Sequence, residues 1–255
     1  MKMKSLLTTV ILMSFGLICV GALADSLSAP QAEIMAKGQA AIDASGEAAK
    51  NSFEVRLNAS ITNNEVAFGE IVHKESGLIC GFGPNENVST TIYHVDGNGK
   101  PDDVGCETNG PFGAVNFYAY RRPNSSIEQQ LEFAITPIMM REPNAELYQD
   151  SPLIWVRWSG QKPSDNEVVT GTLAKAFALR GQAPTFPITS VWVGKHGDWY
   201  IKMRSTHDSA FYDRSGLEWV QLWRKLRPDA HLRDMNKARE KNGAPPLTEL
   251  PAGVD

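Results

Sequence analysis

Residues 188–206, ITSVWVGKHGDWYIKMRST, decide the fold class of this chain. Two segments rich in β-branched and aromatic residues, Ile188–Val193 and Trp199–Thr206, flank Gly194–Asp198, so the stretch predicts a β-hairpin. Along the second strand an apolar row alternates with a polar row. The apolar row is Trp199, Ile201 and Met203, and the polar row is Lys202, Arg204 and Thr206. Successive side chains of a strand point to opposite faces, so we expect one buried face and one polar face.

Similar patterns upstream predict further strands. They are Phe53–Leu57, Val66–His73, Leu78–Phe82, Val88–Val95, Val115–Tyr120 and Leu153–Trp158. Many connections between these strands are too short for the crossover that parallel strands require. We therefore expect an α+β fold, with a mainly antiparallel twisted sheet, helices packed on it and one disulfide.

Helices are predicted in the segments between the strands. Ser28 and Pro30 open an Ala-rich helix that runs to Lys50. Ser125 and Glu128 have capping-box spacing ahead of an apolar helical period that continues past Pro137. Residues 164–180 are ambiguous, because a capping pattern is followed by Thr and Gly residues that disfavour a helix.

The last two predicted helices lie near the C-terminus. Ser215 and Glu218 form a second capping-box spacing, and Arg227-Pro228 ends the helix that follows. Its apolar face would carry Trp219, Val220, Trp223 and Leu226. Asp229–Gly243 is then expected to form a charged surface helix, followed by a Pro-containing tail. The predicted organisation is a single globular domain over residues 25–228, with residues 229–255 forming the helix and tail.

Residues 1–24 have the pattern of an export signal. A basic start, Met1–Lys4, precedes the apolar run Leu6–Val20, and Ala22-Leu23-Ala24 places small residues at the −3 and −1 positions. Cleavage between Ala24 and Asp25 would leave a periplasmic or secreted chain without a transmembrane segment. The alternative is a retained anchor, but the run is shorter than the ~20 residues that span a bilayer.

Charge and motifs exclude several classes of function. The net charge is −4, and without residues 1–24 there are 23 basic and 29 acidic residues. This balance argues against a nucleic-acid-binding protein, which would carry a basic face. The chain has no Walker loop, no Rossmann fingerprint and no G-x-S-x-G sequence, so no cofactor is predicted.

The cysteine content predicts one disulfide. Cys19 would leave with the leader, and Cys80 and Cys106 would remain in an oxidising compartment. Their bond would close a loop of about 27 residues and stabilise the fold by about 3 kcal/mol. We expect it to join neighbouring strands and their long connection. A reactive or metal-binding thiol pair is the alternative.

An acidic turn after the Val88–Val95 strand is a weak candidate for a calcium site. Its oxygen-bearing residues are Asp96, Asn98, Asp102, Asp103 and Glu107. Lys100 and Pro101 stand where a calcium loop needs an oxygen ligand and a glycine. A plain polar turn is the competing interpretation.

The histidines show no zinc-ligand spacing. A hydrolase site that pairs a histidine with a carboxylate stays an alternative. His94 lies near Asp96, and His207 is beside Asp208. A site built from His94 or His196 and a carboxylate would have to be assembled by the fold, because no local sequence brings such groups together.

All six tryptophans follow residue 150. They are Trp155, Trp158, Trp192, Trp199, Trp219 and Trp223. A core is the first interpretation, and an aromatic platform for a sugar, peptide or lipid is the second. The possible ligand-binding residues are Tyr200, Lys202, Arg204, Trp155 and Trp158.

Three phrases of the sequence carry a resemblance. They are Ser76–Cys80 (SGLIC), Asp103–Cys106 (DVGC) and Gly197–Thr206 (GDWYIKMRST). As a set they resemble uncharacterised exported proteins of Gram-negative bacteria. The resemblance implies an exported domain with a paired cysteine and brings no activity or catalytic residue.

Three functional hypotheses follow. The first is a non-catalytic periplasmic protein that binds a small apolar or envelope-derived ligand, or a partner protein of the cell envelope. The alternative is a periplasmic hydrolase with a His/carboxylate site assembled only in the fold. The third is an assembly factor that acts through residues 229–255.

Overall fold

The strands predicted from sequence alternation assemble into two antiparallel sheets. The computed structural model describes residues 27–58, 65–111, 113–148, 171–179, 188–208 and 212–250. The larger sheet has seven strands in the order β4-β5-β6-β10-β9-β8-β7, and the smaller has three in the order β1-β2-β3. The α+β fold with mainly antiparallel pairing is confirmed. The predicted strand Leu153–Trp158 lies outside the described residues.

The elements have the following bounds. The strands are β1 (Phe53–Leu57), β2 (Gly69–His73), β3 (Ile79–Phe82), β4 (Asn87–Val95), β5 (Pro101–Gly110), β6 (Gly113–Arg121), β7 (Glu146–Leu147), β8 (Thr172–Ala178), β9 (Ile188–His196) and β10 (Trp199–His207). The helices are α1 (Ala29–Ala44), α2 (Glu47–Ser52), α3 (Ile127–Arg141), α5 (Tyr212–Leu226) and α6 (Pro228–Lys241). The ambiguous segment 164–180 therefore contains a strand, β8, in its described part.

The β9–β10 hairpin is tighter than the sequence suggested. Lys195 and His196 continue the strand and pair with Tyr200 and Trp199, so the turn is Gly197-Asp198 and not Gly194–Asp198. Gly197 has a φ of 57°, the positive value that type II′ hairpins require at the first turn position.

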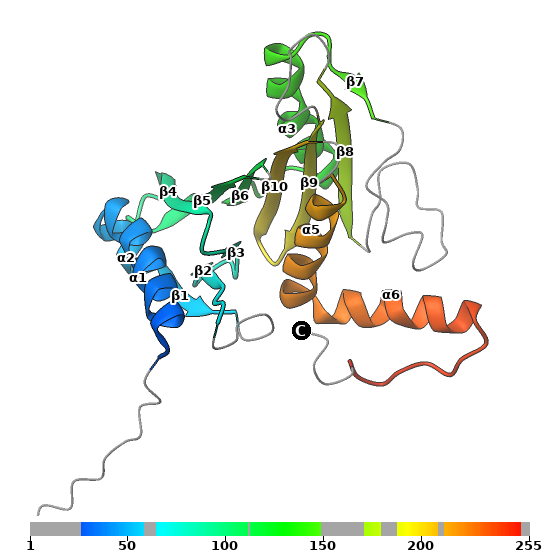
Figure 1. Cartoon of the computed structure of the whole chain (residues 1–255). Helices are drawn as coiled ribbons and strands as arrows, with labels where there is room; N and C mark the ends of the chain where they lie inside the picture. Colours follow the sequence, from blue (N-terminus) through cyan, green and yellow to red (C-terminus); the bar gives the residue numbers. More distant parts are fainter. Residues whose placement is uncertain are drawn as a thin grey trace, which may run out of the picture.

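The helices cover the larger sheet unequally (Figure 1). On one face, α5 packs against the β8–β10 half, while α1 and the smaller sheet pack against β4–β6. On the opposite face, α3 packs against β8 and β9 and forms its own core with Tyr120 and Tyr200. Within the described residues, no helix covers β4 and β5 on that second face.

Two helix starts differ from their predictions. The capping box of α3 is formed by Ser126 and Gln129: the Gln129 amide donates to Ser126 Oγ (3.2 Å), and the Ser126 amide donates to Gln129 Oε1 (2.9 Å). It is thus one residue later than the predicted Ser125 and Glu128 pair. Helix α5 begins at Tyr212, so Ser215 lies inside it and is not its cap.

The predicted apolar face of α5 is confirmed. Trp219, Val220, Trp223 and Leu226 are all buried, and Trp219 stacks on Trp223 with ring centroids 5.5 Å apart. Helix α6 follows as the predicted charged helix. Asn236 of α6 holds the chain after it, since its amide pairs with both backbone groups of Leu247 (2.9 and 2.7 Å). Among the described residues, no helix has both the length and the apolar character needed to cross a bilayer.

The disulfide between Cys80 and Cys106 joins the two sheets. Cys80 lies on β3 and Cys106 on β5, with their Cα atoms 6.5 Å apart, and both side chains are buried. The two strands contact each other but belong to different sheets, so the neighbouring strands that the sequence predicted to be joined are neighbours across the two sheets. It covalently ties the smaller sheet to the face of the larger one.

Removal of this bond should lower stability. A Cys80→Ala/Cys106→Ala variant should lose about 3 kcal/mol of unfolding free energy, because the unfolded chain regains the entropy of a loop spanning 26 residues. Urea unfolding of the variant against the oxidised wild type measures the loss. Equal midpoints, or two free thiols in the untreated wild type, would contradict the prediction.

His73 is a neutral core residue. It is 1% exposed and lies between the rings of Phe53 and Trp199, and its Nδ1 contacts Ser76 Oγ at 2.9 Å. The Ser76 amide also donates to Nδ1 (3.2 Å). Burial lowers the pKa of His73 from 6.5 to about 4, because the charged imidazolium would lose its hydration.

This histidine should make stability depend on pH. Between pH 6.5 and about 4 the unfolded chain binds a proton at residue 73 that the folded chain does not, so stability should fall as the pH is lowered through this window. The full effect is on the order of 3 kcal/mol. Urea unfolding at several pH values should show a shallower decline for His73→Gln than for the wild type. A decline as steep in His73→Gln as in the wild type would contradict the prediction.

Candidate functional site

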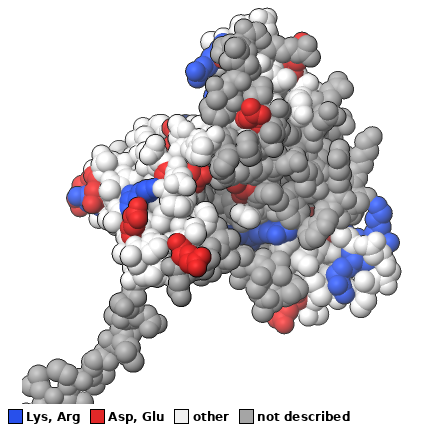
Figure 2. Space-filling model, viewed as in Figure 1, with Lys and Arg blue, Asp and Glu red and all other residues white. Residues whose placement is uncertain are grey.

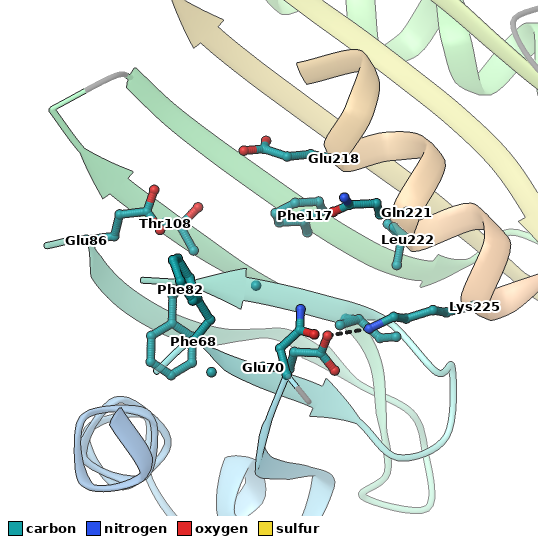
Figure 3. Close-up of a pocket in the computed structure, with 14 residues that line it drawn as sticks. Phe68, Glu70, Phe82, Glu86, Thr108, Phe117, Glu218, Gln221, Leu222 and Lys225 are labelled. Carbon is teal, nitrogen blue, oxygen red and sulfur yellow. Dashed lines mark hydrogen bonds and ion pairs between the residues drawn. The ribbon is translucent and has the colours of Figure 1, made fainter. Parts of the chain in front are cut away.

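A pocket lies where the two sheets and α5 meet (Figure 3). Its volume is about 260 Å³. Strands β2 and β3 supply one wall, β5 and β6 supply the base through Thr108 and Phe117, and α5 supplies the other wall through Glu218, Gln221, Leu222 and Lys225. The pocket therefore depends on three parts of the chain that are far apart in the sequence.

Aromatic and aliphatic side chains form most of the pocket interior. Phe82, Phe117 and Leu222 are buried members of the main core, and Phe68 and Ile79 lie beside them. The strand alternation explains Phe117: it lies on the same face of β6 as Val115, which points into the core. An apolar ligand would thus rest on groups that the core already holds in place.

A buried ion-pair cluster closes one end of the pocket. Glu70 is 4% exposed and accepts from Lys225 Nζ at 2.5 Å and from Arg56 Nε at 3.2 Å. Burying a carboxylate without partners would be costly, and these two cations offset that cost. Because Lys225 comes from α5 and Glu70 from β2, the same contact fastens the helix to the smaller sheet.

Two more carboxylates line the remaining sides. Figure 3 shows Glu218 extending from α5 over the sheet, on the side away from the Glu70–Lys225 pair. Glu86 lies near Thr108, and its Oε2 accepts from the Gly83 amide at 2.7 Å. Among the described residues of the lining there are three carboxylates and one ammonium, so their formal charges sum to a negative value.

The chemistry of the lining suits binding. Its described residues include no histidine, cysteine or serine, so they form no pair of a nucleophile and a histidine base. A mainly apolar interior with a few fixed polar groups is typical of small-molecule sites, although this volume is below the 300 Å³ or so of drug-sized pockets. A small ligand, or one end of a larger one, would fit.

The residues predicted from sequence to bind a ligand lie elsewhere and are only partly brought together. Lys202 and Arg204 lie on the face of the larger sheet opposite the pocket, beside Tyr118 and Asn116 of β6. Tyr200 shares that face but is 1% exposed beneath α3, and its hydroxyl donates to the carbonyl of Ser125. Trp155 and Trp158 lie outside the described residues.

The calcium candidates do not converge. Asp96 Oδ1 accepts from the amides of Asn98 (2.8 Å) and Lys100 (2.9 Å), which makes it a turn residue. Asp102 and Asp103 are consecutive on β5 and so point to opposite faces.

Glu107 lies farther along β5, opposite Asn116. In the described part of the chain, no three His, Cys, Asp or Glu side chains are placed to hold a metal ion.

The histidines named for a hydrolase are separated from the pocket. His94 Nδ1 lies 2.5 Å from Asp102 Oδ1, but the His94 side chain is 63% exposed at the outer edge of the sheet. His196 lines a different, shallow depression near Lys225 and Gly77, where burial lowers its pKa. His207 is buried at the end of β10. The hydrolase hypothesis stays a prediction.

Sequence reasoning missed the pocket because its charged residues have no local signature. Glu218 was interpreted as part of a capping box with Ser215, and Lys225 was not singled out. The available signal was Glu70, a carboxylate within the apolar strand GEIVH, in which all five residues are buried. No protein-family model matches the chain, and no curated protein matches its sequence.

The sequence predicted Tyr200 to be a possible ligand-binding residue, but its buried position predicts a role in stability. Tyr200→Phe should lower stability by about 1 kcal/mol through loss of its hydrogen bond, and Tyr200→Ala by about 3–5 kcal/mol through a cavity beneath α3. Tyr93→Phe, at a 54% exposed ring, is the control and should change little. Thermal unfolding compares them, and an unchanged melting temperature for Tyr200→Ala would contradict the assignment.

Proposed function

We propose that this protein is an exported, non-catalytic binding protein of the cell envelope. The export pattern of residues 1–24 and the Cys80–Cys106 pair support its placement in the periplasm or outside the cell. The observation that carries the binding role is the pocket between the two sheets and α5, with its phenylalanine-rich interior and charged ends.

The lining selects a class of ligand. Phe82, Phe117 and Leu222 favour an apolar body, since each buried CH₂ group contributes about 0.8 kcal/mol. Glu86 and Glu218 favour a cationic group and disfavour an anion by Coulomb repulsion. A small amine with an apolar body therefore matches the pocket better than a carboxylic acid of the same shape.

The charge distribution agrees with a binding role that depends on a local site. Figure 2 shows Lys, Arg, Asp and Glu interspersed over the viewed face of the described part. A large field of one sign would steer polyanions or polycations without regard to shape. Selectivity among ligands would therefore have to come from the residues that line the pocket.

Two matched probes test the proposal. 3-Phenylpropylamine and 3-phenylpropionate share an apolar body and differ in charge, and calorimetric titration should show the amine binding and the acid not binding. Glu218→Gln should weaken amine binding about five-fold, an effect of about 1 kcal/mol.

Glu54→Gln is the control for this titration. Glu54 is an exposed carboxylate of β1 outside this pocket, so its loss should leave amine affinity unchanged. Equal binding of the two probes, no binding of the amine, or an equal effect of the two substitutions would contradict the proposal.

A further inference from the structure

The face of the larger sheet away from the pocket has an open half. Helix α3 covers β8, β9 and the end of β6 that carries Tyr120, whereas β4, β5 and the rest of β6 have no helix over them on this face in the described residues. Paired residues of antiparallel strands share a face, so Tyr118 lies beside Lys202, and Asn116 lies beside Arg204. This open half is where the polar row predicted for β10 emerges.

Lys202 is held between two tyrosines. Its Nζ lies 4.1 Å from the ring centroid of Tyr118 and 5.4 Å from that of Tyr120. Such contacts stabilise a cation at an aromatic face. Within the described structure, the ammonium makes these contacts but no hydrogen bond and no ion pair. The side chain is half-buried, and burial lowers its pKa despite the opposing effect of Asp103.

Arg204 lies two residues farther along the same strand. It is also half-buried on the same face, and it too makes no hydrogen bond or ion pair in the described part of the chain. Burial lowers its pKa. The Cα atoms of the two cations are about 7 Å apart, given the rise of a strand. One anionic group placed between their side chains could therefore receive hydrogen bonds from both.

Two carboxylates lie close enough to raise the pKa values of these cations, Asp103 for Lys202 and Glu142 for Arg204, but in the described structure neither forms an ion pair with them. Asp103, next to Tyr120, forms its ion pair with Arg122 at 3.5 Å. Glu107 lies one strand farther away, opposite Asn116. Two partly dehydrated cations without a direct ion pair are costly for the folded protein, and an anionic ligand would offset that cost.

A flat aromatic surface adjoins the cations. Tyr93 is 54% exposed, and its ring centroid lies 5.9 Å from that of Tyr118. Both rings crowd Gly105, where a Cβ atom would approach Tyr93 to 3.0 Å and the Phe117 carbonyl oxygen to 2.8 Å. Glycine at this position therefore lets the two rings lie over β5 and leaves Tyr93 open to a ligand.

We propose that Tyr93, Tyr118, Lys202 and Arg204 form a second binding site, which takes an anionic sugar. The carboxylate or phosphate of the sugar contacts Lys202 and Arg204, and one face of the sugar ring lies against Tyr93. The ligand class follows from the unpaired cations next to an exposed aromatic ring. This site is independent of the pocket, because the two lie on opposite faces of the sheet.

Three probes that share the same sugar ring and differ in charge test the site. Glucuronate and glucose 6-phosphate carry a negative group, and glucose is the matched neutral sugar. Titrations of the full mature chain followed by amide chemical shifts should show millimolar or tighter binding of at least one anion, with shifts on β6 and β10, and no response to glucose. A carboxylate-specific site and a phosphate-specific site are distinguished by which anion binds more tightly.

Substitutions then locate the binding. Lys202→Gln/Arg204→Gln should weaken anion binding at least tenfold, whereas Lys50→Gln/Lys100→Gln removes the same charge from exposed positions and should change it less than twofold. Lys202→Arg/Arg204→Lys keeps both charges and should retain binding. Tyr93→Ala should weaken glucuronate binding but not the binding of inorganic phosphate.

Several outcomes would overturn the proposal. They are no binding of either anion at millimolar concentration, equal binding of glucose, or equal losses in the test and control pairs. Should the glutamine pair fail to fold, the single variants Lys202→Met and Arg204→Met replace it, and unchanged affinity in both would be equally decisive. Amine binding in the pocket should persist in every variant, so failure here is distinguishable from failure of the proposed function.

Discussion

The pairing of β6 with β10 is the interaction on which the rest of the structure depends. It aligns Gly113–Arg121 with Trp199–His207 in one uninterrupted antiparallel register. The two strands are about eighty residues apart in the chain, and their pairing fuses the β4–β6 meander with the β7–β10 half into a single sheet. On one face it places Phe117 beside Met203 in the core. On the other it places Tyr118 beside Lys202.

The two candidate sites follow from how the two faces of this sheet are covered. On the pocket face, α5 and the smaller sheet meet over Phe117, and the Glu70–Lys225 pair holds them together at one end. On the opposite face, α3 shields only one half and leaves the cations of β10 half-buried. Among the described residues, the lining on one face is acidic and the two cations on the other form no ion pair, so the two proposed sites would suit ligands of opposite charge.

Sequence patterns predicted the strands and helices in which apolar residues recur with a strong strand or helix period. The alternation in Trp199–Thr206 and the helical spacing of Trp219 and Trp223 both hold in the structure. Strand β5 was missed because its sequence, PDDVGCETNG, is rich in residues that disfavour strands. It forms because its neighbours β4 and β6 bond it on both sides and bury Val104 and Cys106. The capping box of α3 lies one residue later than predicted because two consecutive serines, Ser125 and Ser126, precede the helix. Helix α5 begins at Tyr212, before the predicted Ser215.

The sequence by itself determined the α+β class, the antiparallel pairing, the cysteine pair and the two-faced character of β10. These properties follow from the periodicity of apolar residues and from the short connections between strands, and both are local features of the sequence. Only the tertiary structure decided that Tyr200 is buried under α3 while Lys202 is not, that the disulfide joins two sheets, and that Glu70 meets Lys225. The reason is that burial and charge pairing depend on which distant segments lie beside a residue, and long-range strand pairing sets those neighbours.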